Sequence, residues 1–173
     1  KPNNERLENF AAQLDKNNNV WIGDRKNSLV KTWNSGVYGE IIKPNGPAAK
    51  GVFAMDAYGP SVWVASGGFQ SDWSKLYNQE GVYSFSEEEW TSNNKLNTPA
   101  LDTISDMVCV KVDPANPNIA YVGTWQGGLL KFENKELLTV FNEDNSTLQP
   151  NVAAASLIYV SGVDYDSQHN LWV

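Results

Sequence analysis

Acidic side chains are the first candidates for chemistry in this sequence, and three of them stand together at Glu87, Glu88 and Glu89. Paired carboxylates hydrolyse glycosidic bonds when they face each other across the sugar, roughly 5 to 9.5 Å apart. Three successive residues between two strand-like segments instead form a turn whose side chains diverge into solvent. The run therefore predicts a solvated hairpin turn and not a catalytic pair.

The chain has one cysteine, Cys109, and one histidine, His169. A cysteine nucleophile requires a base beside it, but Cys109 lies in the strand-like segment MVCVKV and His169 lies in the polar segment DSQHN. Nothing in the sequence brings them together. A single thiol also excludes an internal disulfide and a cysteine-based zinc site. We interpret Cys109 as a small buried thiol.

Signatures of other catalytic or cofactor sites are also missing from the sequence. There is no G-x-S-x-G nucleophile turn, and the glycine-rich segment GTWQGG lacks the lysine and the following helix of a phosphate-binding loop. We therefore predict a protein without enzymatic activity, catalytic residues or a cofactor.

Aspartates recur just before the first expected hairpin turn of each repeated segment. They are Asp15, Asp56, Asp113 and Asp164. Clustered oxygen ligands could hold calcium, and the segment DYDSQHN would be the first place to look for such an ion. No segment matches the spaced loop D-x-[DN]-x-[DN]-G with a later glutamate. An aspartate that accepts hydrogen bonds from the turn backbone is the simpler explanation, so we predict turn capping and no metal site.

The clearest pattern is an internal repeat of a polar turn, an aromatic residue flanked by aliphatics, and a small residue. It occurs in the segments NNNVWIG, GPSVWVAS, NPNIAYVGT and QHNLWV, with the aromatic anchors Trp21, Trp63, Tyr121 and Trp172. The anchors recur at intervals near the roughly 40 to 50 residues of a four-stranded propeller blade. The second interval is the longest because residues 67–80 are inserted there. The repeat predicts an all-β fold of β-propeller blades, each with four antiparallel strands.

Alternation of apolar and polar residues places the strands inside each unit. In the third unit we predict strands at 106–113, 119–124, 129–133 and 136–141, with Gly127 and Gly128 at the reversal between the second and the third. The predicted blades span roughly 5–43, 51–93, 104–142 and an incomplete 155–173. We interpret residues 1–173 as one partial propeller domain of about three and a half blades, a fragment of a larger propeller, because three and a half blades cannot close a ring.

Charge and hydropathy exclude two classes of partner. The 13 basic and 20 acidic residues give a net charge of −7, whereas nucleic-acid binding needs clustered Lys and Arg. No run approaches the roughly 18 apolar residues of a membrane helix. We expect no nucleic-acid partner and no membrane segment in this chain.

Several motifs resemble the propeller repeats of Bacteroidetes surface and periplasmic proteins. The likeness covers most of residues 52–173 and rests on VYSFSEEEW, DPANPN, TWQGGLLKFE, FNEDNSTL and VSGVDYDSQHNLWV. Two groups carry such repeats, namely PorZ-like proteins of the type IX secretion system and the sensor propellers of hybrid two-component regulators. The DPANPN turn and the insert with SDW resemble the PorZ-like group more closely.

The resemblance implies a non-enzymatic component of a cell-surface complex that processes secreted cargo and attaches it to an anionic lipopolysaccharide. It implies a periplasmic or cell-surface location at the outer membrane. The implied partners are proteins of a surface or secretion complex, with lipopolysaccharide or oligosaccharide as a further ligand. The alternative is an extracytoplasmic sensor propeller that binds oligosaccharides. A third reading, a carbohydrate-active enzyme, lacks a catalytic constellation.

The seven tryptophans are the remaining signal for a binding site, since flat aromatic faces bind sugars and proteins. We expect Trp21, Trp63 and Trp172 to be core residues because they share one strand position. In an antiparallel blade, the links between strands two and three lie at the same end as the links between blades. That end collects the long segments 24–28, 67–80, 125–128 and 142–150. Long loops on a rigid scaffold carry recognition, so we predict a binding site there. Its predicted residues are Phe69, Trp73, Tyr77 and Trp125.

Overall fold

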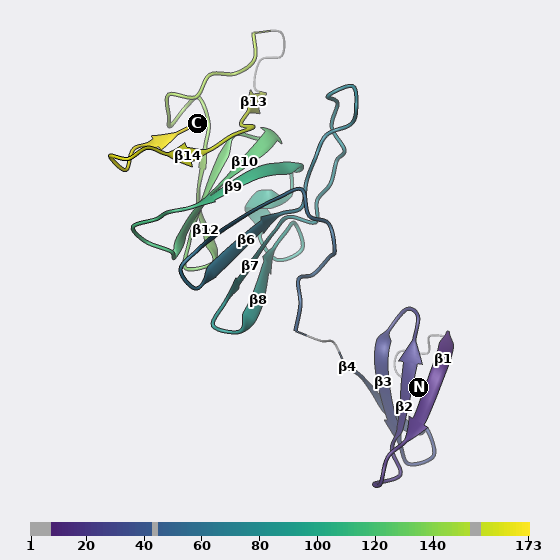
Figure 1. The fold of residues 1–173 in the computed structure, drawn as a ribbon. Helices are drawn as coiled ribbons and strands as arrows, with labels where there is room; N and C mark the ends of the chain where they lie inside the picture. Colours follow the sequence, from purple (N-terminus) through teal and green to yellow (C-terminus); the bar gives the residue numbers. More distant parts are fainter. Residues whose placement is uncertain (1–7, 43–44, 153–156) are drawn as a thin grey trace. The chain divides into compact units, whose positions relative to one another are not determined.

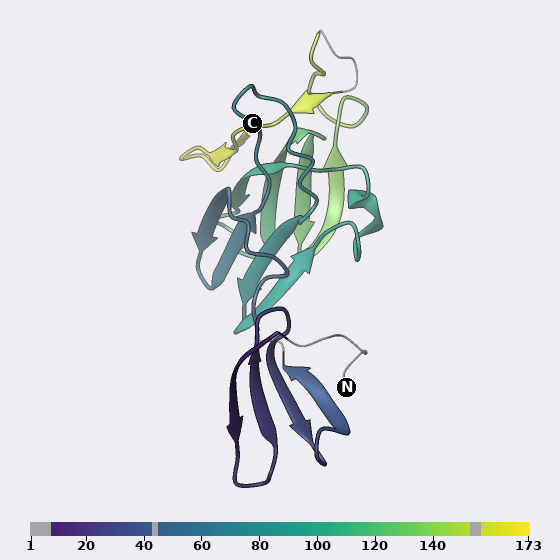
Figure 2. The same ribbon diagram turned by 90° about the vertical axis from the view of Figure 1, so that its right-hand side faces the viewer.

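The computed structural model describes residues 8–42, 45–152 and 157–173 of the chain (Figures 1 and 2). The chain divides into two compact units, residues 1–45 and 46–173. In the described part, the regular elements are β-strands and one short 3₁₀ turn, η2 (Pro99–Leu101). The fold is therefore all-β, as predicted.

The first unit is one antiparallel sheet of four strands in sequence order. Its strands are β1 (Asn9–Leu14), β2 (Val20–Asp24), β3 (Ser28–Trp33) and β4 (Tyr38–Ile42). The anchor Trp21 lies opposite Gln13 on β1 and Lys31 on β3. Val30 is the one fully buried apolar side chain among residues 8–42, so this unit has almost no core of its own.

The second unit contains two further four-stranded antiparallel sheets, again in sequence order. The first consists of β5 (Ala54–Tyr58), β6 (Ser61–Ala65), β7 (Val82–Ser86) and β8 (Glu89–Asn93). The second consists of β9 (Met107–Val112), β10 (Ile119–Gln126), β11 (Leu129–Glu133) and β12 (Glu136–Phe141). The strands predicted for the third unit thus agree with the structure to within two residues.

Alternating apolar residues on these strands form a shared core between the two sheets. Two pairs of apolar residues stand two positions apart on one strand, so the members of each pair point to the same face of the sheet. These pairs are Val110 and Val112 on β9, and Leu130 and Phe132 on β11. They pack against the neighbouring sheet, where Trp63 is 2% exposed. The rings of Trp63 and Phe132 lie 5.3 Å apart between centroids. This interface is the main hydrophobic core of the second unit.

The end of the chain begins a fourth unit in a way that the sequence did not indicate. An incomplete blade was predicted over 155–173, but β13 (Ile158–Tyr159) instead extends the sheet of β10 by pairing with Trp125 and Gln126. The hairpin of β14 (Asp164–Tyr165) and β15 (Leu171–Trp172) follows. The predicted blade limits at 5–7, 43 and 155–156 lie outside the described residues. That the whole chain forms a single domain stays a prediction.

The four aromatic anchors occupy equivalent positions on the second strand of their units, as predicted. They lie opposite Gln13, Asp56, Lys111 and Asp164 respectively. Their burial differs, however. Trp63 is buried, Trp21 and Tyr121 are half-buried, and Trp172 is 65% exposed. Trp172, which we predicted to be a core residue, is thus exposed on the two-stranded sheet of β14 and β15.

Candidate binding face

Two kinds of loop lie at opposite ends of the sheets in the second unit. The antiparallel strand order places the β6–β7 link, the β8–β9 link and the β10–β11 link at one end, which we call the long-loop face. The β5–β6, β7–β8, β9–β10 and β11–β12 turns lie at the other end, the short-turn face. The β6–β7 link extends as a long loop beyond the ends of its strands (Figure 1). The predicted site residues all belong to the long-loop face.

Three of the four predicted residues form one aromatic cluster. The ring centroids of Phe69 and Trp73 lie 4.8 Å apart, with an angle of 22° between the ring planes. The centroids of Phe69 and Trp125 also lie 4.8 Å apart, with an angle of 34° between the planes. Trp73 and Trp125 lie 5.9 Å apart at 30°. The Trp125 indole N–H donates a hydrogen bond of 2.9 Å to the backbone carbonyl of Trp73. The cluster therefore joins the β6–β7 link to the end of β10.

The members of the aromatic cluster differ in exposure. Trp73 is 63% exposed, whereas Phe69 and Trp125 are half-buried. Phe53 packs edge-on against Phe69, and Tyr159 packs edge-on against Trp125. Trp73 thus presents a broad apolar ring to solvent, while the rings around it provide support. Exposed aromatic side chains of this kind contribute large contact area to a partner.

Tyr77, the fourth predicted residue, lies apart from the aromatic cluster. Its side chain is 74% exposed, and its ring contact is with the Lys75 ammonium, 5.8 Å from the ring centroid. Its backbone has positive φ. The structure therefore brings together Phe69, Trp73 and Trp125 and leaves Tyr77 as a separate exposed aromatic on the same link.

A buried carboxylate that the sequence did not indicate fixes the β6–β7 link in place. Asp106 is fully buried, and its two carboxylate oxygens accept hydrogen bonds from the backbone N–H groups of Tyr77 and Asn78, at 3.0 and 2.8 Å. Its own N–H donates to the Asn78 carbonyl. At the other end of the link, the Gly67 N–H bonds to Met107, and a Cβ at Gly67 would lie 2.1 Å from the Met107 nitrogen. The link is therefore tied to the start of β9 at both ends.

The candidate catalytic groups have separate partners. The Cys109 thiol is hydrogen-bonded to the Val160 carbonyl at 3.6 Å, and burial raises its pKa to about 11. His169 Nε2 lies 2.8 Å from Asp113 Oδ1. Glu87 and Glu88 form the β7–β8 turn and are exposed. Within the described residues, no group of three His, Cys, Asp or Glu side chains is arranged to hold a metal ion.

Asp15 and Asp113 cap turns as predicted. Asp15 accepts hydrogen bonds from the Asn17 and Asn19 N–H groups, and Asp113 accepts them from the Ala115 and Asn116 N–H groups. Burial disfavours the charged form of Asp113, but hydrogen bonds from Ala115 and His169 among others bring its pKa below the ordinary value.

The capping prediction is wrong for Asp56 and Asp164. The β5–β6 turn contains only Gly59 and Pro60, because Tyr58 already pairs with Ser61. Asp56 therefore lies inside β5, opposite Trp63. Asp164 lies opposite Trp172 in the same way, and Asp166 takes the capping position in that hairpin.

These two aspartates instead form a charge ladder with Lys111, which lies opposite Tyr121. The Lys111 ammonium is 3.0 Å from Asp164 Oδ1 and 3.9 Å from Asp56 Oδ1. The hydrogen bond to Asp164 is the main cause of a raised Lys111 pKa, and it lowers the pKa of Asp164. Asp56 also accepts a hydrogen bond of 2.8 Å from the Val112 N–H. The ladder connects the first strands of three successive units.

A solved structure shares this fold. PorZ of Porphyromonas gingivalis, a bacterial surface component of the type IX secretion system, superposes on 95% of this chain with a TM-score of 0.65 at 18% sequence identity. The chain shares its fold with part of PorZ. It spans 23% of the PorZ chain. The similarity to a PorZ-type propeller that the sequence motifs predicted is thus confirmed at the level of the fold.

Extracellular domains from two B. thetaiotaomicron regulators also match. The domain of one hybrid two-component system has a TM-score of 0.46 at 16% identity, over 89% of this chain and 19% of that one. The domain of the other has a TM-score of 0.43 at 17% identity, and the match covers 97% of this chain and 19% of that one. No protein-family model matches the chain, and the search of curated proteins gave no significant match. No helix in the described residues is long and apolar enough to cross a membrane.

Proposed function

We propose that this chain is a non-enzymatic β-propeller module of a bacterial surface assembly of the type IX secretion kind, located in the periplasm or at the cell surface. It binds a protein partner or a surface glycan through the long-loop face. The fold shared with part of PorZ, a surface component of such a system, supports the biological setting. The sequence motifs that resemble PorZ-like repeats support the same setting.

The aromatic cluster is the observation that carries the proposed binding role. Trp73 exposes 63% of its surface although three rings and a hydrogen bond hold the cluster together. Exposing such a ring to water is unfavourable. The Trp73 ring stacks on Phe69, and the Trp73 carbonyl accepts a hydrogen bond from Trp125, so binding orders this side chain less than it would order a free one. Tryptophan is enriched among the residues that contribute most of the binding energy of protein interfaces, and its large flat ring offers contact area to other ligands as well.

The proposal predicts that Trp73→Ala weakens partner binding while leaving the fold intact. Binding should fall by about 2 kcal/mol or more, roughly thirtyfold, because the ring supplies contact area. The melting temperature should change little, since most of the ring is in solvent. The measurement is surface plasmon resonance of the 173-residue chain against purified type IX secretion components, lipopolysaccharide and an oligosaccharide panel.

Leu138→Ala is the matched control, because Leu138 is also an exposed apolar residue, 58% exposed, but lies on β12. Its binding should equal that of the unmodified chain. Equal binding by Trp73→Ala and the unmodified chain would disprove the role of the aromatic cluster. Oligosaccharide binding that is lost in Trp73→Ala, with no binding to protein components or lipopolysaccharide, would favour the sensor alternative.

A further inference from the structure

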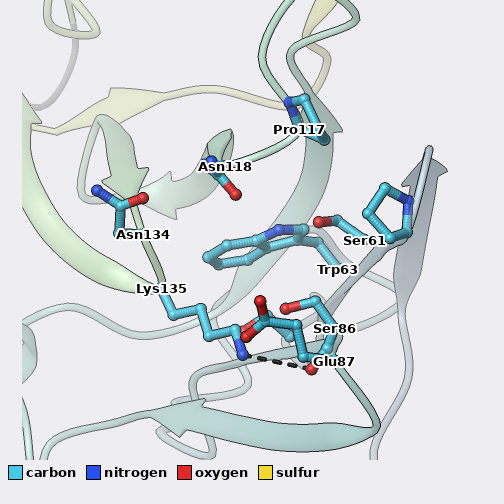
Figure 3. Close-up of a pocket in the computed structure, with 10 residues that line it drawn as sticks. Ser61, Trp63, Ser86, Glu87, Pro117, Asn118, Asn134 and Lys135 are labelled. Carbon is cyan, nitrogen blue, oxygen red and sulfur yellow. Dashed lines mark hydrogen bonds between the residues drawn. The ribbon is translucent and has the colours of Figure 1, made fainter.

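A hollow lies at the short-turn face, where the sequence indicated no site. It has a volume of about 370 Å³ and lies between the β5–β8 sheet and the β9–β12 sheet. Figure 3 shows the Trp63 indole at its centre, with Asn118 and Asn134 on one side and Lys135 with Glu87 on the other. The volume falls at the small end of the roughly 300 to 1,000 Å³ of ligand sites.

Comparison of the repeats explains why the hollow exists in this blade. The residue opposite the aromatic anchor on the third strand is Lys31 in the first unit and Lys131 in the third. Lys31 extends over its anchor, with the ammonium 5.5 Å from the centroid of Trp21. In the second unit this position is Ser84. Serine is shorter than lysine and carries no ammonium, so the side chain at this position takes up less space beside the anchor than Lys31 does in the first unit.

The unpaired hydroxyl of Ser84 indicates that the hollow takes a ligand. It lines the hollow and is only 2% exposed. Its hydroxyl is the one buried side-chain oxygen or nitrogen within residues 8–42, 45–152 and 157–173 that lacks a hydrogen-bond partner. Buried hydroxyl groups are nearly always paired, because removing one from water without a partner is unfavourable. A ligand hydroxyl in the hollow would supply the missing partner.

Hydrogen bonds between the two sheets hold the walls of the hollow in place. The Asn93 side-chain amide donates to the Lys135 carbonyl at 2.8 Å, and the Lys135 ammonium donates to the Ser86 carbonyl at 3.4 Å (Figure 3). The Asn134 N–H donates to the Asn118 carbonyl at 2.9 Å. The β7–β8, β9–β10 and β11–β12 turns are therefore joined around the opening, and the site is preformed.

The lining selects for a neutral ligand with many hydroxyl groups. Glu87 contributes an acceptor with negative charge and Lys135 a donor with positive charge, so these two groups give the lining no net charge that would attract an ion. Asn118 and Asn134 offer both donors and acceptors. A sugar hydroxyl both donates and accepts, so it can pair with every one of these groups.

We infer that the hollow between the second and third sheets is a binding site for one neutral sugar residue, seated beside Trp63 and hydrogen-bonded to the Ser84 hydroxyl. This site is separate from the aromatic cluster of the long-loop face. Its existence does not depend on the proposed surface-assembly function.

The test is saturation-transfer NMR and calorimetry of the 173-residue chain with glucose, galactose, mannose and N-acetylglucosamine. At least one sugar should bind. Ser84→Lys, which restores the residue of the neighbouring units, should abolish that binding by filling the hollow. Ser84→Ala should weaken it about tenfold, through loss of one hydrogen bond to a buried group. It should not lower the melting temperature, because no protein partner of the hydroxyl is lost.

Ser167→Lys is the control for the added charge, since Ser167 is exposed in the β14–β15 turn; this variant should bind like the unmodified chain. Trp73→Ala should also bind the sugar normally, which separates this site from the long-loop face. The inference is overturned if none of the four sugars binds, or if sugar binding is lost in Trp73→Ala and kept in folded Ser84→Ala. If Ser84→Lys fails to fold, the Ser84→Ala comparison decides alone.

Discussion

At the scale of single residues, one hydrogen-bond pattern recurs in two distant turns. Asp15 accepts bonds from the Asn17 N–H, the Asn19 N–H, the Asn19 side-chain amide and the Trp21 indole. Asp166 makes the same four contacts, with Gln168, Asn170 and Trp172. The pattern Asp-x-x-x-Asn-x-Trp therefore links the turn to the orientation of the anchor through hydrogen bonds within one hairpin.

The shared pattern predicts an acid transition of the β14–β15 hairpin. Hydrogen bonds from Asn170, and then from Trp172, lower the pKa of Asp166 from its ordinary 3.8 to about 2. A lowered folded-state pKa contributes stability that is complete above pH 3.8 and is lost as the pH falls through about 2. The Trp172 indole N–H resonance should therefore shift with a midpoint near pH 2. Asp166→Asn should lack this shift, and a midpoint at 3.8 would contradict the prediction.

At the scale of elements, the charge ladder connects β5, β9 and β14 through Lys111. Lys111→Met keeps the apolar stem but removes the charge. We expect a loss of about 0.5 to 1 kcal/mol in unfolding free energy, because both ion pairs are partly exposed. Amide exchange should accelerate mainly in β14–β15, since Asp164 loses its closest cation whereas Asp56 keeps the Val112 N–H. Lys131→Met, on the other side of Tyr121, is the control; unchanged exchange in the hairpin would contradict the role of the ladder.

The same elements show what the sequence predicts well. Strands β9 to β12 follow from local alternation and from turn residues, so their positions agree with the structure to within two residues. The sequence pattern placed Asp56 at a turn. The β5–β6 turn has only two residues, so Asp56 lies inside β5, two positions before the residue that would cap the turn. The pairing of β13 with β10, the buried Asp106 and the hollow beside Ser84 depend on contacts between segments far apart in the chain. No local pattern encodes such contacts.

At the scale of the whole molecule, the buried residues are divided unequally between the two units. Residues 46–173 contain one large apolar cluster around Trp63 and Phe132 and a smaller one around Leu129, Ile158 and Val160. Among residues 8–42, Val30 is the single fully buried apolar side chain. A lone sheet with so little buried surface gains too little free energy to offset the entropy of ordering its chain.

This division predicts different behaviour for the two units when each is expressed separately. Residues 46–173 should fold, with a cooperative thermal transition and dispersed NMR signals, because their clusters bury apolar surface within the unit. Residues 1–45 should show the narrow signal dispersion of an unfolded chain. Sugar binding at the Ser84 hollow should persist in 46–173, since every residue that lines it belongs to that unit. Loss of the cooperative transition in 46–173 would show that its core is not sufficient by itself.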